Sequence, residues 1–243
     1  MLFPEAVRTH LYIDGFNLYY GCLKDSAFKW LNPAQMAALL LPGHTITAIH
    51  YFSANVSARP SDPDQLIRQQ TYFRALRSLP HLTIHLGYFK AHRVRMPLVN
   101  PPPGGPGMVL VWRTDEKGSD VNLATQMLVD GFDYAYECAV LVTNDSDLQG
   151  PIRAVQQKLG RKVGLLNPQQ RPGRALHGAV DFYKKIREGV LIASQFGDQT
   201  NLTKNHGSNV SWMKSKRASF LRLGGLFQMS GIMTRHPKRP ENS

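Results

Sequence analysis

Short, fully apolar runs alternate with amphipathic helical patterns along this chain, and that alternation limits the fold more than any other feature of the sequence. The run "AVLVT" (139–143) shows it most clearly, because a helical pattern follows directly at 151–159. A strand without a polar face has to be covered on both sides, as happens in the parallel sheets of α/β proteins. The sequence therefore predicts an α/β fold around a mostly parallel sheet.

The positions of the individual elements follow from local periodicity. Strands are expected where apolar, β-branched and aromatic residues run together, at 11–13, 45–53, 82–89, 108–113, 139–143 and 162–166. Helices are expected at 17–24, 33–41, 63–79, 119–132, 151–159 and 178–196. In the helix at 119–132, the residues Val121, Ala124, Leu128 and Phe132 form the expected apolar stripe.

Two segments do not fit the alternating pattern. The stretch "PLVNPPPGGPG" (97–107) is expected to be a loop inserted between two strands, because proline lacks an amide donor and glycine is entropically costly in regular structure. The segment 197–243 is polar and basic with weak periodicity, and we expect a partly disordered appendage there. The predicted organisation is one domain over 1–196 and a C-terminal appendage over 197–243.

Composition restricts the classes of function. The net charge of +12 favours polyanionic partners such as nucleic acids, although residues 201–243 alone contribute +7, so a solvated basic tail is a strong alternative. No stretch reaches the ~20 apolar residues of a membrane-spanning helix, and the N-terminus lacks the pattern of a signal peptide. Cys22 and Cys138 do not form a metal-binding spacing and are expected to be reduced thiols. These features favour a cytoplasmic protein without a membrane partner.

Acidic residues follow several of the expected strands. Asp14 follows the strand at 11–13, Asp120 opens the helix after the strand at 108–113, and Asp145 and Asp147 follow the most apolar strand. The carboxyl ends of parallel strands meet at one edge of a sheet, which is where ligands bind in such folds. We therefore expect these four carboxylates at one edge, with Glu116 nearby.

Each of these carboxylates also has a local explanation. Asp14 suits a turn with Gly15, Asp120 suits the first turn of a helix, and Asp145 or Asp147 suits a helix cap. Pro151 is expected at the first position of its helix, which places both Asp145 and Asp147 in the preceding extended loop. A cap then accounts for at most one of the two.

Metal binding gives the four acids a common purpose. Clustered carboxylates repel one another, and a hard cation such as Mg²⁺ or Mn²⁺ removes that conflict because it prefers carboxylate oxygens. A metal ion held in this way activates water and stabilises charge on a phosphoryl group. The sequence thus indicates phosphoryl chemistry at an acidic site on a basic protein.

Three blocks of this sequence, "YIDGFNLYY", "EKGSDVNLATQML" and "LVTNDSDLQGPIRAVQQKLGRKVGLL", resemble the signature blocks of NYN domains. These domains belong to the PIN-like nuclease superfamily, and the likeness is to its LabA-like bacterial branch. It extends over roughly residues 8–190. The resemblance implies a three-layer α/β/α sandwich, metal-dependent RNA cleavage and, in PIN-like domains generally, a tendency to pair as homodimers.

The resemblance also implies roles for single residues. Asp14, Asp120, Asp145 and Asp147 match the metal-binding acids of the family, and Asn17 matches an amide that positions a water or substrate oxygen. Thr143 is expected to hydrogen-bond a phosphate or a metal-bound water. Cleavage through this site would leave 5′-phosphate and 3′-hydroxyl ends.

Basic residues near the proline-rich loop are candidates for binding RNA. They are Lys90, Arg93, Arg95, Arg113 and Lys117, and an ordinary solvated hairpin explains them equally well. His81 and His85 have strand spacing, but without a third ligand they are better explained as surface or packed residues than as a zinc site. An RNA-binding or regulatory module with a weakly active metal site is the main alternative to a ribonuclease, and a phosphatase is a weaker one.

Overall fold

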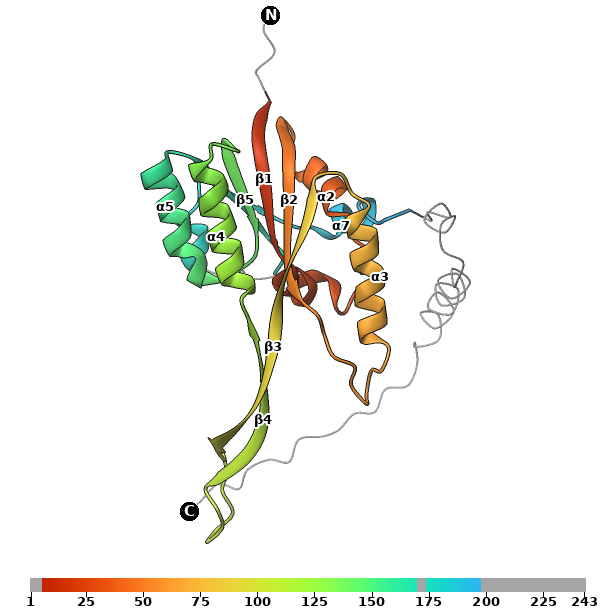
Figure 1. Cartoon of the computed structure of the whole chain (residues 1–243), viewed down its shortest axis with the longest axis vertical. Coiled ribbons are helices and arrows are strands. Elements are labelled where there is room, and N and C mark those ends of the chain that lie inside the picture. The colour runs from red at the N-terminus through yellow and green to blue at the C-terminus, as the bar shows by residue number, and fades with distance from the viewer. Residues whose placement is uncertain (1–5, 170–173, 198–243) are drawn as a thin grey trace, which may run out of the picture. The chain divides into compact units, whose positions relative to one another are not determined.

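The computed structural model describes residues 6–169 and 174–197 of the chain (Figure 1). Nearly all of the predicted C-terminal appendage lies outside the described residues, so the division into 1–196 and 197–243 stays a prediction. Among the described helices, none combines the length and the apolar character needed to cross a bilayer.

Seven strands form one sheet in the order β4-β3-β2-β1-β5-β6-β7. They are β1 (Val7–Asp14), β2 (His44–Ala54), β3 (Leu82–Pro97), β4 (Met108–Lys117), β5 (Cys138–Val142), β6 (Lys162–Asn167) and β7 (Phe182–Lys185). In the sheet order, all neighbouring strands from β3 through β2, β1, β5 and β6 to β7 pair in parallel. The edge strand β4 pairs antiparallel with β3. The predicted mostly parallel sheet is confirmed, with an antiparallel hairpin at one end.

Helices cover both faces of the sheet, which gives three layers (Figure 1). On one face lie α1 (Gly15–Leu18), the π-helical turn η1 (Tyr19–Leu23), α2 (Pro33–Leu40), α3 (Gln65–Arg77) and α7 (Glu188–Ala193). On the other face lie α4 (Ser119–Phe132), α5 (Gln149–Leu159) and α6 (Arg174–His177). In β1, Leu11 and Ile13 pack into the first layer and Tyr12 into the second. Both faces of the central strands are therefore buried, as the apolar runs predict.

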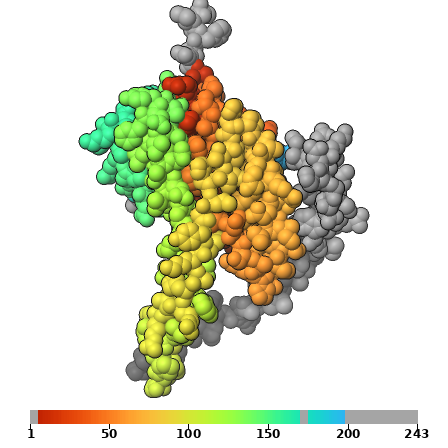
Figure 2. Space-filling model, in the orientation of Figure 1, coloured from red at the N-terminus to blue at the C-terminus, as the bar shows by residue number. Residues whose placement is uncertain are grey.

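The hairpin of β3 and β4 projects from the body of the domain as a two-stranded arm (Figures 1 and 2). Beyond Gly87, β3 no longer pairs with β2, and its only described strand partner is β4, from Tyr88 opposite Lys117 to Pro97 opposite Met108. The loop predicted at 97–107 connects these two strands, with Pro97 as the last residue of β3. Apolar side chains such as Trp112, which is 72% exposed, lie on the arm surface.

The helix predicted at 178–196 is wrong, because the segment contains β7 followed by α7. Phe182 pairs with Gly164 of β6, where a Cβ atom would lie only 2.1 Å from the phenyl ring. The Asp181 carboxylate accepts a hydrogen bond of 2.7 Å from the Val163 amide. The secondary structure of this segment depends on its pairing with β6, and local periodicity carries no information on such pairing.

Helix α4 has the predicted bounds, but its predicted apolar stripe is only half correct. Val121 and Phe132 are 69% and 64% exposed, while Leu123 and Met127 are fully buried. The buried face is thus rotated, because α4 packs on β1, β2 and β3 and also against α5. Asp130 lies on this buried face, which an apolar stripe would not include.

Candidate active site

Strand β1 ends at Asp14, which is 4% exposed. Asp14 is also the N-cap residue of helix α1. Its Oδ1 accepts a hydrogen bond from the Asn17 amide (2.9 Å) and its Oδ2 accepts one from the Asn17 side-chain Nδ2 (2.7 Å). Gly15 allows this abrupt turn, since a Cβ atom there would lie 2.7 Å from the Phe52 carbonyl oxygen. The strand therefore ends in a carboxylate that is both buried and fixed in orientation.

The end of β5 is joined to Asp14 through side chains. The Thr143 hydroxyl donates to Asp14 Oδ2 (3.2 Å) and accepts from the Asp145 amide (3.1 Å). The Asn144 amide donates to Asn17 Oδ1 (3.3 Å). Thr143 and Asn17 thus hold Asp14 and the following loop in a fixed relation, and the Thr143 proton is directed at Asp14.

Asp145 and Asp147 flank a short 3₁₀ helix, η2 (Ser146–Leu148), which differs from the predicted extended loop. Asp145 caps this helix, because its Oδ1 accepts from the Asp147 amide at 3.0 Å. Helix α5 follows without a break at Gln149, two residues before the predicted start at Pro151. The cap accounts for Asp145, which is half-buried, and leaves Asp147 with its exposed side chain unexplained.

Asp120 lies in the first turn of α4, as predicted. Gly118 precedes this helix with φ of 98°, a left-handed conformation that glycine adopts at no steric cost. Glu116, the last but one residue of β4, accepts from the Ser119 hydroxyl (2.8 Å) and amide (3.2 Å). Because of this turn, the hairpin and the helix present Glu116 and Asp120 beside the ends of β1 and β5.

The burial and mutual proximity of these carboxylates affect their pKa values. Burial raises the pKa of Asp14, against the lowering effect of its hydrogen bonds from Asn17 and Thr143. Desolvation and the charges of Asp14, Asp145, Glu116 and Asp147 together raise the pKa of Asp120 to about 6. The structure thus brings the four predicted acids, with Glu116, to one edge of the sheet, and we call this group the acidic edge.

The sequence analysis missed one residue of this edge. Gln169 follows β6, and its Nε2 donates to Asn17 Oδ1 (3.3 Å) while its Oε1 accepts from Asn144 Nδ2 (3.0 Å). The Gln169 amide is held in turn by Asn167 Oδ1 (2.8 Å). The signal that could have found Gln169 is its place after the strand next to β5, where polar residues again end an apolar run.

The donor atoms of the acidic edge suit a hard divalent cation. They are carboxylate oxygens, and among the described residues no three of these carboxylates place one oxygen each within 4.8 Å of one another. Mg²⁺ is usually held by one or two carboxylates and keeps several water ligands, so it tolerates this spacing, whereas a closed tetrahedral zinc site does not.

The five basic residues predicted to bind RNA all lie on the arm, but they divide between its two faces. Opposed residues of an antiparallel pair share a face, and successive residues alternate. Lys90, Arg113 and Lys117 therefore lie on one face, and Arg93 and Arg95 on the other. Arg113 Nε donates to Asp115 Oδ1 (2.7 Å), and the Arg93 guanidinium lies 5.8 Å from the centre of the Trp112 ring.

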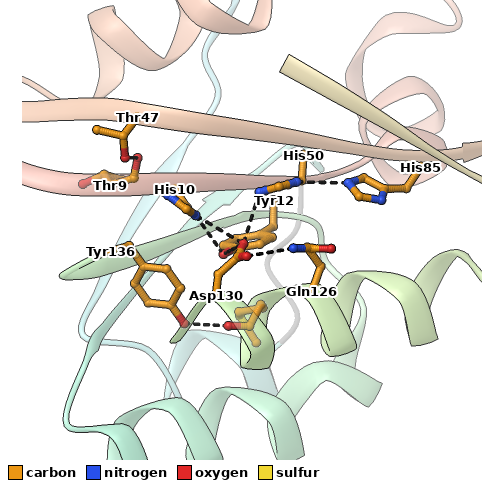
Figure 3. Close-up of polar contacts among 10 residues, drawn as sticks. Thr9, His10, Tyr12, Thr47, His50, His85, Gln126, Asp130 and Tyr136 are labelled. Carbon is orange, nitrogen blue, oxygen red and sulfur yellow. Dashed lines mark hydrogen bonds and ion pairs between the residues drawn. The ribbon is translucent and has the colours of Figure 1, made fainter. Parts of the chain in front are cut away.

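A second polar group, which the sequence analysis also missed, lies between the sheet and α4 (Figure 3). His10 from β1, His50 from β2 and Asp130 from α4 converge there, and we call these three residues the histidine cluster. Histidines in otherwise apolar strands are the signal that could have found it. His85 packs on the Phe52 ring (4.6 Å between centroids, 15° between planes), in agreement with the expected packed histidine.

Comparisons with known proteins identify the family and agree with the fold. The sequence model of the NYN domain matches residues 8–186. The chain is 30% identical over 222 residues to 6-hydroxy-3-succinoylpyridine 3-monooxygenase HspA of Pseudomonas putida, and the match covers 79% of this chain and 70% of that protein. A crystal structure of a protein of unknown function from Vibrio parahaemolyticus superposes with a TM-score of 0.51 at 17% identity, covering 77% of this chain and 98% of that one. This likeness concerns the fold alone.

Proposed function

Because the chain belongs to the NYN domain family, a family of PIN-like nucleases, we propose that it is a Mg²⁺- or Mn²⁺-dependent ribonuclease. The observation that carries the proposal is the meeting of Asp14, Asp120, Asp145 and Asp147 at one sheet edge. These carboxylates come from three separate segments of the chain, and burial together with the charges of its acidic neighbours raises the pKa of Asp120 to about 6. A cluster of like charges is costly for a fold and becomes useful where a cation is to be bound.

The roles of the residues follow from their contacts. Asp14, Asp120, Asp145 and Asp147 would hold the metal, one or two of them directly and the others through its water ligands. When bound, the metal activates water and stabilises charge on the phosphoryl oxygens. Asn17 and Thr143 orient the Asp14 carboxylate through hydrogen bonds of 2.7–3.2 Å. Buried Asp14 lies deepest in the site and exposed Asp147 lies at its rim.

The arm is the proposed RNA-binding element. It leaves the body beside the acidic edge, because β4 runs directly into Glu116 and the start of α4. Exposed Arg93 and Arg95 share one face with exposed Trp112, and arginine together with an aromatic ring suits phosphates and stacked bases. We further propose a cytoplasmic protein that acts as a homodimer.

The test is cleavage of fluorescent single-stranded RNA, beside DNA of the same sequence, by the full chain in Mg²⁺ or Mn²⁺. We expect RNA fragments that carry 5′-phosphate and 3′-hydroxyl ends. Release of inorganic phosphate without chain cleavage would indicate a phosphatase. Binding without cleavage would indicate an RNA-binding or regulatory module.

A second candidate function is favoured by the similarity to the Pseudomonas monooxygenase. In this alternative the chain inserts one atom of O₂ into a hydroxylated pyridine, and a two-electron reductant such as NADH reduces the other atom to water. The full chain would be incubated with 6-hydroxy-3-succinoylpyridine, oxygen and NADH, with and without added iron. Consumption of the pyridine by wild-type protein, with RNA left intact in the parallel assay, would replace the ribonuclease proposal by this one.

A further inference from the structure

The histidine cluster brings three potential metal ligands together in a nearly dry environment. His10 and His50 approach Asp130 from neighbouring strands, as Figure 3 shows. The side chains of His10, His50 and Asp130 are 9%, 12% and 13% exposed. One ligand atom from each lies within 4.8 Å of the other two, and this is the only such group of three among the described residues. The cluster therefore differs from the acidic edge in both location and chemistry.

The distances in the cluster fit the coordination sphere of a small transition metal. Asp130 Oδ2 lies 3.2 Å from His10 Nδ1 and 3.1 Å from His50 Nε2. With metal–ligand bonds of about 2.0–2.1 Å, the edges of a coordination tetrahedron measure about 3.3–3.4 Å. The two separations from Asp130 Oδ2 are thus within a few tenths of an ångström of such an edge, and the two ring nitrogens lie within 4.8 Å of each other.

Hydrogen bonding does not account for His50. Although its Nε2 is buried and lies 3.1 Å from Asp130 Oδ2, it makes no hydrogen bond of acceptable geometry. Its other ring nitrogen, Nδ1, lies 3.0 Å from His85 Nε2. If Nδ1 carries the proton of a neutral ring, Nε2 presents a lone pair to the carboxylate oxygen. Two acceptors at this distance repel each other unless a proton or a metal ion lies between them, and the approach lacks the geometry of a hydrogen bond.

Two of the three ligands, His50 and Asp130, have outer partners of the kind that hold ligands in known metal sites. His50 Nδ1 lies 3.0 Å from His85 Nε2, within hydrogen-bonding distance, and the His85 ring is held by packing on the Phe52 ring. Asp130 Oδ1 accepts from Gln126 Nε2 at 2.7 Å. The Tyr12 hydroxyl donates to Asp130 Oδ2 at 2.7 Å. Such outer hydrogen bonds orient ligands and set their affinity.

We infer that His10 Nδ1, His50 Nε2 and Asp130 Oδ2 form a binding site for one divalent first-row transition-metal ion. Two imidazoles and one carboxylate select Zn²⁺, Fe²⁺ or Co²⁺ over Mg²⁺ and leave one or more coordination positions open. The site is separate from the proposed nuclease centre, since its ligands lie within β1, β2 and α4 instead of at the strand ends. The inference does not depend on the proposed function.

The probes are Zn²⁺ and Co²⁺, added to the full-length chain after treatment with a chelator. We expect one equivalent of Zn²⁺ to bind in competition with a chromogenic chelator, even in excess Mg²⁺. Co²⁺ should produce the visible absorption bands of a nitrogen- and oxygen-ligated ion, and Zn²⁺ should remove them. His50→Gln should weaken Zn²⁺ binding about 100-fold or more, because removal of an outer partner alone costs 10–100-fold. The matched control is His177→Gln, at an exposed histidine of α6, and it should bind Zn²⁺ as wild type does.

Two results would overturn the inference. One is the absence of stoichiometric Zn²⁺ binding by folded wild-type protein. The other is equal loss, or equal retention, of binding in His50→Gln and His177→Gln. If His50→Gln does not fold, Asp130→Asn serves as the second variant, and the Co²⁺ spectrum of wild type still decides whether imidazole ligands are present. A wild-type spectrum of hydrated Co²⁺ would show that the cluster is a hydrogen-bonded network only.

Discussion

The acidic edge and the histidine cluster are both polar sites in an α/β domain, but the fold builds them in opposite ways. The acidic edge collects carboxylates from strand ends and helix starts, and its side chains range from buried Asp14 to exposed Asp147. The histidine cluster takes its residues from the middle of β1, from β2 and from the buried face of α4. Its side chains are at most 13% exposed.

The difference shows how one fold can separate two kinds of metal chemistry. An open group of carboxylates suits an ion that keeps its water and shares it with a phosphate. A closed group of imidazoles and one carboxylate suits an ion that prefers nitrogen ligands and exchanges slowly with solvent. Three predictions test whether the two groups are as different as their geometry indicates, and a fourth concerns the arm.

The largest effect is expected from Asp120→Asn in the acidic edge. Loss of this carboxylate should lower Mn²⁺-dependent RNA cleavage by about 100-fold or more. Removal of a residue that only supports a metal ligand already lowers metal affinity or activity by about 10–100-fold. The metal-free protein should unfold at the same or a higher temperature, because the charges of Asp14 and Asp145 no longer repel a neighbour. Asp133→Asn, at an exposed position just after α4, is the control for cleavage and for thermal unfolding. A strongly destabilised Asp120→Asn would argue that Asp120 is a structural cap.

In the histidine cluster, Asp130→Asn should act on stability in the opposite direction. Hydrogen bonds from Tyr12 and Gln126 reach the Asp130 carboxylate at 2.7 Å, and bonds to a charged group contribute about 1.5–3 kcal/mol. We expect the metal-free variant to lose about 2 kcal/mol of unfolding free energy in urea titration. A loss no larger than that of Asp133→Asn would mean that this buried carboxylate contributes nothing without a metal.

A smaller effect on cleavage is expected from Asn17→Ala. The substitution removes the side-chain hydrogen bond from Asn17 Nδ2 to Asp14 and the acceptor for Gln169, while the backbone amide bond to Asp14 remains. Cleavage should therefore fall by about 10-fold through a misplaced ligand. The discriminating measurement is the Mn²⁺ concentration for half-maximal rate, which should rise in the variant. An unchanged metal dependence with a lower maximal rate would instead assign Asn17 to the substrate.

The smallest effect is expected on the arm, from Arg95→Ala. If Arg95 contacts one phosphate, RNA binding should weaken and the slope of log affinity against log salt should fall by about 1. Arg113→Ala is the matched control, because Arg113 is already paired with Asp115 and lies on the other face. Equal effects of the two substitutions would show that the arm binds RNA without a preferred face.

Most of the fold could be predicted from the sequence, because the positions of most strands and helices follow from patterns within a single segment. The apolar run 139–143 and the helix bounds of α4 needed no knowledge of distant segments. The edge strand β7 was missed because its identity depends on Phe182 packing over Gly164 of β6.

The acidic edge and the histidine cluster also differ in how far the sequence alone predicts them. The acidic edge was predictable because all parallel strands end at one edge, so the places of Asp14 and Asp145 follow from topology. The histidine cluster depends on the pairing of β1 with β2 and on the rotation of α4 that buries Asp130. Neither can be read from a single segment, and the predicted stripe of α4 was correct for Ala124 and Leu128 only.

The most direct test of the central claim is single-turnover cleavage of RNA by the full chain and by Asp145→Asn, in Mn²⁺ and in EDTA. Our account predicts cleavage by wild type in Mn²⁺, and neither cleavage in EDTA nor cleavage by the variant under any condition. RNA that stays intact but bound in all four reactions would contradict a nuclease and leave a binding module. Cleavage that persists in Asp145→Asn would show that the acidic edge is not the active site.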